Sequence, residues 1–404
     1  MKQQLSYISA RDMLLERAKP VGRKTMPLEE CYGRILADDI YAGMSIPPFD
    51  RSPYDGYAVK ASDTRGASRD NPVVLDVMES IPAGSVPQKD IVSGKAARIM
   101  TGAPMPRGAD AVVMFEKTEF TDEWVKLFSE VESGSNVVTA GEDVHKGRLI
   151  ARAGERIDAG VMGMAASQGM ADLPVYAKPV IGIISTGTEV VQVGSELLPG
   201  KIYDSNRFTL LPVIQGAGCE ALYLGLAGDR AEEISALITK GLDSCDAVLL
   251  TGGVSVGDYD VTAIAMQLSG AEVLIRSVAM KPGMACAFGT AGEKLVCALS
   301  GNPAAAATSL IAVVLPSLRR LCGMTDALLP EVTVTLADGF DKPSKVTRIL
   351  RGKLDLSDGT ARMRLSPEQG NVVLASVAGC DVMAVVPAGS GPLAAGTELK
   401  GFLL

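Results

Sequence analysis

The strongest constraint on the fold is an alternation of short apolar segments with helical patterns after Pro179. Apolar runs of this kind are typical of strands that are buried on both faces of a sheet. Their alternation with helices predicts an α/β domain with a doubly wound parallel sheet. The predicted strands are residues 180–184, 221–225, 247–250, 272–275 and 295–299.

Helix start signals follow these strands. Residues 204–207, Asp-Ser-Asn-Arg, begin one helix, and a capping box from Asp229 to Glu232 predicts a second helix that runs to Lys240. Asn302 and Pro303 begin the last helix, with Asn as the cap and Pro in the first turn.

Three loops fall at the carboxyl ends of the predicted strands, where open α/β sheets bind their ligands. Glycines in such loops let backbone N–H groups approach a ligand, and the acidic pair Asp258 and Asp260 suits a hard cation such as Mg²⁺. No G-x-G-x-x-G or Walker A pattern is present, which disfavours ordinary dinucleotide or P-loop binding. The loops are residues 185–189, 251–260 and 300–303.

The middle loop alone does not decide between function and a solvated turn. Glycine-rich strand–helix turns are common, so Thr251 to Asp260 taken by itself leaves both readings open at roughly even odds. The convergence of three such loops at one edge of the sheet favours a binding site.

The segments on either side of the α/β region have other patterns. An amphipathic helix is expected over residues 6–19, capped by Ser6 or Ser9. Short β-branched segments over residues 73–138 predict a small antiparallel β module, and a helix within residues 154–169 returns the chain from it. Alternating, glycine-punctuated segments beyond Pro330 predict an all-β, barrel-like domain.

Four domains follow from these patterns, in a multidomain α/β plus β fold. They are a discontinuous N-terminal linker domain (residues 1–45 and 145–178), an inserted β module (46–144), an α/β domain (179–326) and a C-terminal β domain (327–404).

Composition excludes several classes of function. The formal net charge of -8 and an aromatic content of 4% argue against a nucleic-acid-binding surface. His145 is the single histidine, so Ser-His-Asp and multi-histidine metal chemistry are excluded. The 7 cysteines have no close sequence spacing and are expected to be buried free thiols in a reducing compartment. The amino terminus lacks a signal-peptide pattern, and the apolar segment 304–318 is too short to span a bilayer, so a cytoplasmic protein is expected.

Motifs in order along nearly the whole chain resemble the molybdopterin molybdenumtransferase family, the MoeA proteins and gephyrin E domains. A match to one such motif would be weak evidence for the family, whereas matches to this many motifs in the same order are highly specific. The motifs are residues 47–50, 55–59, 98–104, 141–143, 185–189, 203–206, 251–260, 280–283 and 301–303.

The resemblance implies insertion of molybdate into adenylylated molybdopterin, with Mg²⁺-assisted release of AMP. It further implies that residues 179–326 form a domain of molybdopterin-binding type and that residues 1–45 and 145–178 serve in dimerisation. The implied homodimer has its active-site cleft between the α/β domain and the β module of the partner subunit. A separate small molybdopterin adenylyltransferase protein is the implied upstream partner, and molybdoenzymes are possible acceptors of the product.

The resemblance also assigns roles to residues of this sequence. The implied catalytic residues are Asp55, Thr101, Asp143, Glu189 and Lys281, and the implied Mg²⁺ ligands are Glu189, Asp229, Asp258 and Asp260. The implied substrate-binding residues are Ser185, Thr186, Gly187, Gly252, Gly253, Ser255, Gly257, Gly283, Ser300, Gly301, Asn302, Pro303, Arg348 and Arg351.

The sequence departs from the family pattern on the basic side of the site. Ser277 and Met284 stand where the family usually has lysines, whereas the acidic residues are all present. Ser300 replaces a usual proline, and Asn371 a usual serine. Arg276, Arg348 or Arg351 could replace the missing charge. Two hypotheses therefore remain: an active molybdenumtransferase, and a diverged paralogue that acts as a pterin-binding scaffold, carrier or regulator.

Overall fold

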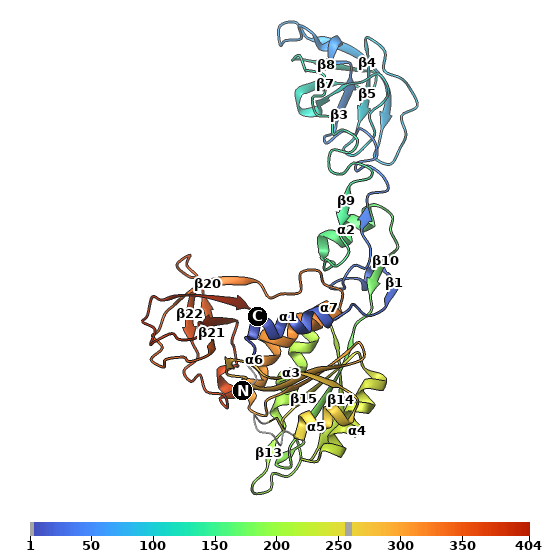
Figure 1. Cartoon of the computed structure of the whole chain (residues 1–404). Coiled ribbons are helices and arrows are strands. Elements are labelled where there is room, and N and C mark those ends of the chain that lie inside the picture. Colours follow the sequence, from blue (N-terminus) through green and yellow to red (C-terminus); the bar gives the residue numbers. More distant parts are fainter. Residues whose placement is uncertain (1–3, 255–260) are drawn as a thin grey trace. The chain divides into compact units, whose positions relative to one another are not determined.

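The computed structural model describes residues 4–254 and 261–404. The chain forms two compact units, which we describe separately (Figure 1). Unit 1 comprises Met1–Asp38, Ala153–Asp158 and Asp172–Leu404, and unit 2 comprises Asp39–Arg152 and Ala159–Ala171. The finer division into the four domains given above stays a prediction.

A mixed six-stranded sheet forms the centre of unit 1 and confirms the predicted α/β fold. The first four strands in its order are parallel, while β18 is antiparallel to both of its neighbours. The sequence reading did not identify β18; a two-residue connection at Gly292 and Glu293 joins it to β19, and so short a loop permits only an antiparallel pair. The order is β14 (Glu220–Ala227), β11 (Val180–Thr186), β15 (Ala247–Thr251), β19 (Lys294–Leu299), β18 (Ala285–Ala291) and β16 (Glu272–Ser277).

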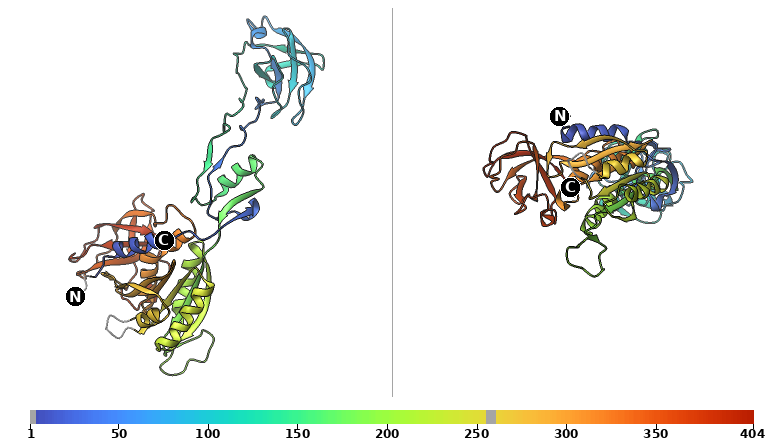
Figure 2. Two further views of the ribbon diagram at one scale, coloured as in Figure 1. Left: turned by 45° about the vertical axis from the view of Figure 1, so that its right-hand side comes forward. Right: turned by 60° about the horizontal axis from the view of Figure 1, so that its bottom comes forward.

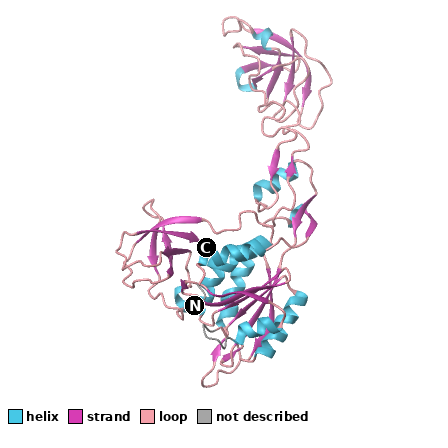
Figure 3. Ribbon diagram, in the orientation of Figure 1, coloured by secondary structure: helices cyan, strands magenta, loops and turns pink. Residues whose placement is uncertain are grey.

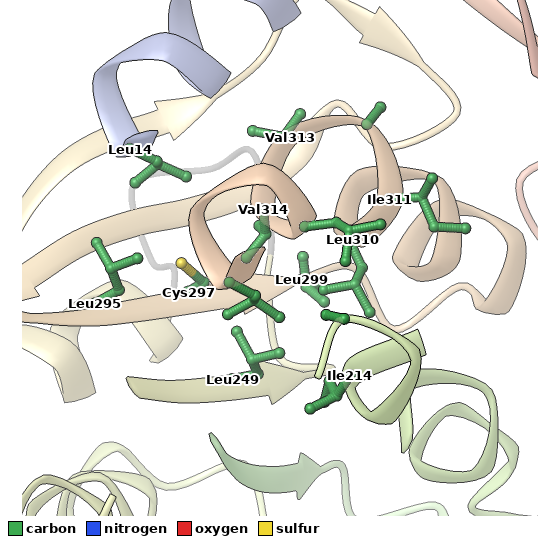
Figure 4. Close-up of a cluster of buried hydrophobic side chains, with 14 of the residues drawn as sticks. Leu14, Ile214, Leu249, Leu295, Cys297, Leu299, Leu310, Ile311, Val313 and Val314 are labelled. Atoms are coloured by element: carbon green, nitrogen blue, oxygen red, sulfur yellow. The ribbon is translucent and has the colours of Figure 1, made fainter. Parts of the chain in front are cut away.

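Helices cover both faces of this sheet. Leu249 of β15 packs on one face with Leu14 of α1 (Tyr7–Arg17) and Ile214 of α3 (Ser205–Gly216), as Figure 4 shows. The neighbours of Leu249 in β15 point the other way, into a second core with α4 (Ala231–Ser244) and α5 (Val261–Leu268). This alternation explains why the strands read as continuous apolar runs.

The predicted caps are confirmed in α1 and α3 but not in α4. Asn302 stands at the N-cap position of α6 (Pro303–Ser309) with Pro303 in the first turn, as predicted, but its side chain makes no capping hydrogen bond. Ser6 caps α1 by accepting a hydrogen bond from the Ser9 N–H, and Asp204 caps α3 by accepting one from the Arg207 N–H. The predicted capping box at Asp229 is wrong, because α4 begins after Arg230 with no side-chain cap, and the Asp229 carboxylate binds Thr188 instead.

One helical segment runs through the first core as α6 (Pro303–Ser309), η4 (Leu310–Val314) and α7 (Leu315–Leu321). Among the described residues this segment alone, Pro303–Leu321, is long and apolar enough to cross a membrane, which corrects the expectation that the apolar segment 304–318 is too short for this, because the helix continues on both sides of it. Because 89% of its 18-residue apolar window is buried inside the protein, it has the character of a core helix.

A closed five-stranded barrel forms the C-terminal part of unit 1 (Figure 3). It closes because β23 pairs with both β24 and β21. The edge strand β17 (Met280–Lys281) pairs with β21 and so connects the barrel to the α/β part. The barrel strands are β20 (Glu331–Leu336), β21 (Thr347–Asp355), β22 (Arg362–Leu365), β23 (Val382–Val386) and β24 (Glu398–Leu403), with η5 at Leu374–Ser376.

Smaller elements complete unit 1. A two-stranded ribbon joins β1 (Arg23–Pro27) to β10 (Asp172–Tyr176), and η1 (Leu28–Glu30) follows β1. The strands β12 (Val190–Val191) and β13 (Ile202–Tyr203) pair at the base of a projecting loop, which Figure 2 shows.

Unit 2 contains a second six-stranded sheet, in the order β6-β3-β5-β4-β8-β7. All of its pairings are antiparallel except that of β4 with β5, which the prediction of a purely antiparallel module did not include. The strands are β3 (Gly56–Val59), β4 (Val73–Ile81), β5 (Lys95–Ile99), β6 (Ala111–Met114), β7 (Thr118–Phe120) and β8 (Trp124–Leu127). The remaining elements are β2 (Ile40–Tyr41), β9 (Leu149–Ala151), α2 (Ala159–Ser167), η2 (Ala61–Thr64) and η3 (Phe115–Lys117).

Candidate active site at the carboxyl edge of the central sheet

A cavity of about 630 Å³ opens at the carboxyl ends of β11, β15 and β19. Parallel strands bring their loops together at this edge, as the sequence predicted. Nine of the implied site residues line the cavity, namely Ser185, Thr186, Glu189, Gly252, Gly253, Ser300, Gly301, Asn302 and Pro303. The other lining residues are Val190, Ile202, Tyr203, Asp204, Ser205, Asn206, Thr251, Val254 and Val372. Implied residues Ser255, Gly257, Asp258 and Asp260 lie outside the described residues.

Glycines let the three loops approach one another closely. Gly252 has φ +100°, and a Cβ there would overlap the carbonyl oxygen of Thr186. A Cβ on Gly301 would lie 3.3 Å from the Gly252 Cα atom. Backbone rather than side chains therefore forms this wall of the cavity, which suits an anion that binds to N–H groups.

Two helices begin at the cavity. Ser205 and Asn206 form the first turn of α3, while Pro303 begins the long helical segment that continues to Leu321. The positive ends of both helix dipoles thus face the same cavity, and this end of a helix attracts phosphate and other anions. Asp204 stays buried beside them because its carboxylate accepts hydrogen bonds from the Ser185 hydroxyl, at 2.5 Å, and from the Arg207 N–H, at 3.1 Å.

Glu189 provides the acidic side of the cavity. Its carboxylate folds back over Gly187, since a Cβ on that glycine would lie 2.7 Å from Glu189 Oε2. Its loop is tied down on either side: the Asp229 carboxylate accepts from the Thr188 N–H, and Lys201 donates to the Thr188 carbonyl at 2.6 Å.

The acidic residues fit a hard cation only in part. Glu189 and Asp229 are exposed carboxylates on connected loops, the kind of ligand that Mg²⁺ takes singly while keeping most of its water. No group of three or more possible metal ligands occurs among residues 4–254 and 261–404. The implied ligand set is completed only by Asp258 and Asp260, outside the described residues.

The implied basic residues and Gly283 do not line the cavity. Lys281 is exposed on β17, in register with Arg348 of the barrel. Arg348 is buried against the Phe340 ring, and burial lowers its pKa. Gly283 is buried, and a Cβ there would overlap the Ser309 hydroxyl.

Arg351 is fully buried inside the barrel and next to the segment that borders the cavity. Its Nε donates to the Ser376 hydroxyl at 2.8 Å, and one Nη donates to the Gly370 carbonyl at 3.3 Å. Burial lowers the pKa of Arg351 to about 10. Asn371, the residue after Gly370, accepts a hydrogen bond through its backbone carbonyl from the Ala305 N–H of α6, at 3.1 Å.

The other implied catalytic residues belong to unit 2. The Asp55 carboxylate accepts hydrogen bonds from the Thr101 N–H, at 2.7 Å, and from the Thr101 hydroxyl, at 2.8 Å. These bonds lower the pKa of Asp55. Asp143 is exposed in a turn, where its N–H donates to the Ile46 carbonyl and its own carbonyl accepts from Arg148.

Comparisons with known proteins agree along the whole chain. Three family models match: the MoeA N-terminal region (domain I and II) over residues 5–169, a "probable molybdopterin binding domain" over 182–320, and the MoeA C-terminal region (domain IV) over 333–404. The molybdopterin molybdenumtransferase of Bacillus subtilis is 37% identical over 93% of this chain and 89% of its own length. That of Staphylococcus epidermidis is 34% identical over 91% of this chain and 88% of its own.

The chain belongs to the molybdopterin molybdenumtransferase family.

Solved structures agree with this assignment. A crystal structure of the molybdopterin biosynthesis MoeA protein from Pyrococcus horikoshii has a TM-score of 0.87 at 32% identity, covering 99% of both chains. A crystal structure of a molybdopterin biosynthesis MoeA protein from Pyrococcus horikoshii OT3 gives a TM-score of 0.85 at 28% identity, covering 100% of both chains. As a molybdenumtransferase, the protein has a transferase role in molybdenum cofactor biosynthesis.

Asp204, Ser205 and Asn206 line the cavity, but the sequence analysis did not identify them as site residues. The sequence predicted them as a helix start and matched residues 203–206 to a family motif, but gave them no place in the site. One signal could have found them, because a helix that follows a parallel strand begins at the ligand-binding edge of the sheet. Val372 carried no such signal, since only folding of the barrel brings it there.

Proposed function

We propose that this protein inserts molybdate into adenylylated molybdopterin and releases AMP in a Mg²⁺-dependent step. The observation that carries the proposal is that two helix N-termini, a glycine-lined wall and Glu189 border one cavity. Such a cavity suits a phosphate-linked ligand together with a divalent cation.

In this proposal the protein binds and orients the substrates, and none of its side chains reacts covalently with them. Backbone N–H groups near Gly252 and at the start of α3 hold phosphate oxygens, and the closely packed loops fix their direction. Glu189 and Asp229 would hold Mg²⁺ together with Asp258 and Asp260, and the cation would neutralise charge on the departing phosphate. No side-chain nucleophile is required, which fits a chain with one histidine.

Molybdate would bind on the basic side, where Lys281 and Arg348 lie in register between β17 and β21. Lys281 is exposed and therefore able to meet an oxyanion, whereas Arg348 would have to leave its place against Phe340. Asp55, Thr101 and Asp143 would complete the site from unit 2 of a second copy in a homodimer.

A second candidate function rests on one observation. Arg348 and Arg351 are buried in the barrel and do not line the cavity, so neither supplies to it the positive charge that is lost where Ser277 and Met284 stand in place of the usual lysines. A paralogue that binds the pterin as scaffold, carrier or regulator without turnover would have such a site.

The remaining features of the proposal concern the cellular setting. A small adenylyltransferase protein would supply the substrate, and molybdoenzymes would take the product. We also propose a cytoplasmic location, which free cysteines suit because a reducing compartment keeps thiols unpaired.

An assay with purified protein tests the proposal. Adenylylated molybdopterin, molybdate and Mg²⁺ are added together, and AMP is followed by chromatography. Molybdate-dependent release of AMP is expected. Binding of the pterin substrate with no release above background would instead favour the non-catalytic paralogue.

A further inference from the structure

Asn206 connects three segments at the edge of the cavity. It lies in the first turn of α3, and its side-chain Nδ2 donates hydrogen bonds to Thr251 Oγ1 at 2.7 Å and to the Gly301 carbonyl at 2.8 Å. Thr251 ends β15, and Gly301 follows β19. One amide group thus bridges the start of a helix and two of the three ligand-facing loops.

The chemistry of the partners fixes the orientation of this amide. The Gly301 carbonyl can only accept, so the atom facing it must be the nitrogen. Thr251 Oγ1 donates its own hydrogen to the Ser300 carbonyl at 3.2 Å, so it too must accept from Asn206. The network Asn206–Thr251–Ser300 therefore has one direction, and reversing the amide would break both of its bonds.

These bonds add to the few others that restrain the same backbone: the Gly252 N–H donates to the Leu299 carbonyl at 3.2 Å, and the Thr262 hydroxyl donates to the Gly252 carbonyl at 3.4 Å. Gly252 and Gly253, which follow Thr251, have φ +100° and +64°, and glycine can leave such conformations at low cost. Gly301 has no side chain to pack and lies against Gly252. Asn206 is the side chain that bonds to residues on both sides of this glycine contact, and it supplements the backbone bond from Gly252 to Leu299 in setting the spacing of the two loops.

We propose that Asn206 is a positioning residue that holds the Thr251–Gly253 and Ser300–Gly301 loops in register for the phosphate-bearing ligand. The inference rests on the proposed function, because it takes the phosphate-linked nucleotide as the ligand of these loops. It predicts that loss of the amide weakens binding of the nucleotide part and leaves the molybdate requirement unchanged.

The test compares AMP binding by isothermal titration calorimetry, with Mg²⁺ present, for the wild type, Asn206→Ala and Asn206→Asp. Asp has nearly the size of Asn but presents an oxygen to Gly301, so it removes the donated bonds and preserves the packing. We expect both variants to weaken AMP binding by about tenfold or more, equivalent to about 1.4 kcal/mol. In the AMP-release assay the KM for adenylylated molybdopterin should rise, while the KM for molybdate should stay within about twofold of the wild-type value.

Controls separate positioning from folding. Asn71→Asp makes the same chemical change in unit 2, at an exposed side-chain amide that donates to the Gly66 carbonyl. This control should leave AMP binding unchanged. If thermal melting shows that both Asn206 variants are unfolded, Thr251→Val replaces them, since it removes one acceptor and keeps the side-chain shape.

The outcomes are distinct. Wild-type AMP affinity in a folded Asn206→Asp or Thr251→Val protein overturns the positioning role. An equal rise in the KM for molybdate overturns it too, because the effect would then be a general loss of structure. A wild-type protein that neither binds AMP nor releases it refutes the proposed function instead.

Discussion

The Oδ2 atom of Asp229 accepts two hydrogen bonds from Thr188, one from its backbone N–H at 3.2 Å and one from its side-chain hydroxyl at 2.8 Å. Thr188 precedes Glu189, so the implied metal ligand Asp229 also anchors the loop of the acidic residue that lines the cavity. Only one of its oxygens makes hydrogen bonds to the described residues, which leaves the other for a cation.

This relationship predicts different behaviour for two substitutions. In Asp229→Asn the remaining oxygen can still accept from Thr188, so the loop should keep its place while the negative charge is lost. We expect a higher Mg²⁺ concentration for half-maximal AMP release and an unchanged melting temperature. Asp229→Ala should lower both activity and melting temperature. Identical Mg²⁺ titrations for Asp229→Asn and the wild type would exclude Asp229 as a metal ligand.

Gly187 should tolerate no side chain. It has φ +133°, and a Cβ would lie 2.7 Å from the Glu189 carboxylate. In Gly187→Ala we therefore expect Glu189 to be displaced and Mg²⁺-dependent AMP release to fall about tenfold or more, with a loss of stability of about 1–3 kcal/mol from backbone strain.

Gly194→Ala is the matched control. Gly194 also has a positive φ, +91°, but no atom lies within 4 Å of a Cβ built there. It should show the strain without the loss of activity. An equal loss of activity in the two variants, measured in the same assay, would mean that strain rather than displacement of Glu189 is responsible.

The Asp55–Thr101 pair should be visible in a titration. The Thr101 N–H and hydroxyl hold the folded-state pKa of Asp55 below its ordinary value. Folding stability from this pair is therefore present above the unfolded-state pKa of Asp55 and is lost as the pH falls through the lower folded-state pKa.

Removing the hydroxyl should weaken this effect. Thr101→Val should raise the pKa of Asp55, measured by ¹³C NMR of the carboxyl carbon, whereas Thr101→Ser should leave it low. A pKa that is the same in Thr101→Val and the wild type would show that the backbone N–H alone sets it.

Arg351 should matter for stability as well as for any role in the site. Its buried guanidinium donates to Ser376 and Gly370, and Arg351→Ala would leave a cavity and unpaired polar groups in the barrel. Urea denaturation should show a loss of about 2–4 kcal/mol. Arg362→Ala, which breaks the exposed ion pair with Asp358, should cost about 1 kcal/mol or less. Equal losses would contradict a structural role for Arg351.

Much of the fold could be predicted because its signals are local. The strand–helix alternation after Pro179 and the caps at Ser6 and Asp204 need only neighbouring residues, and the structure contains all three. The antiparallel strand β18 is absent from the predicted strands, and its direction depends on the short turn at Gly292, which the pattern of strands and helices did not resolve.

The structure corrected predictions wherever a polar side chain found a distant partner. Asp229 has the sequence spacing of a helix cap, but its carboxylate accepts a hydrogen bond from Thr188 of another loop instead of capping α4. By contrast, Cys219 and Cys322 are the buried free thiols that the sequence predicted, although their Sγ atoms lie 3.4 Å apart in the core.

The sequence by itself determined that polar loops at Ser185, Thr251 and Ser300 meet at one edge of a sheet, because parallel strands leave no other place for them. Tertiary structure alone decided that Asn206 is hydrogen-bonded to two of these loops and that Arg351 is buried inside the barrel, away from the cavity lining. Hydrogen bonds between segments depend on side-chain directions and on which partners remain unsatisfied, and packing fixes both only when the whole chain has folded.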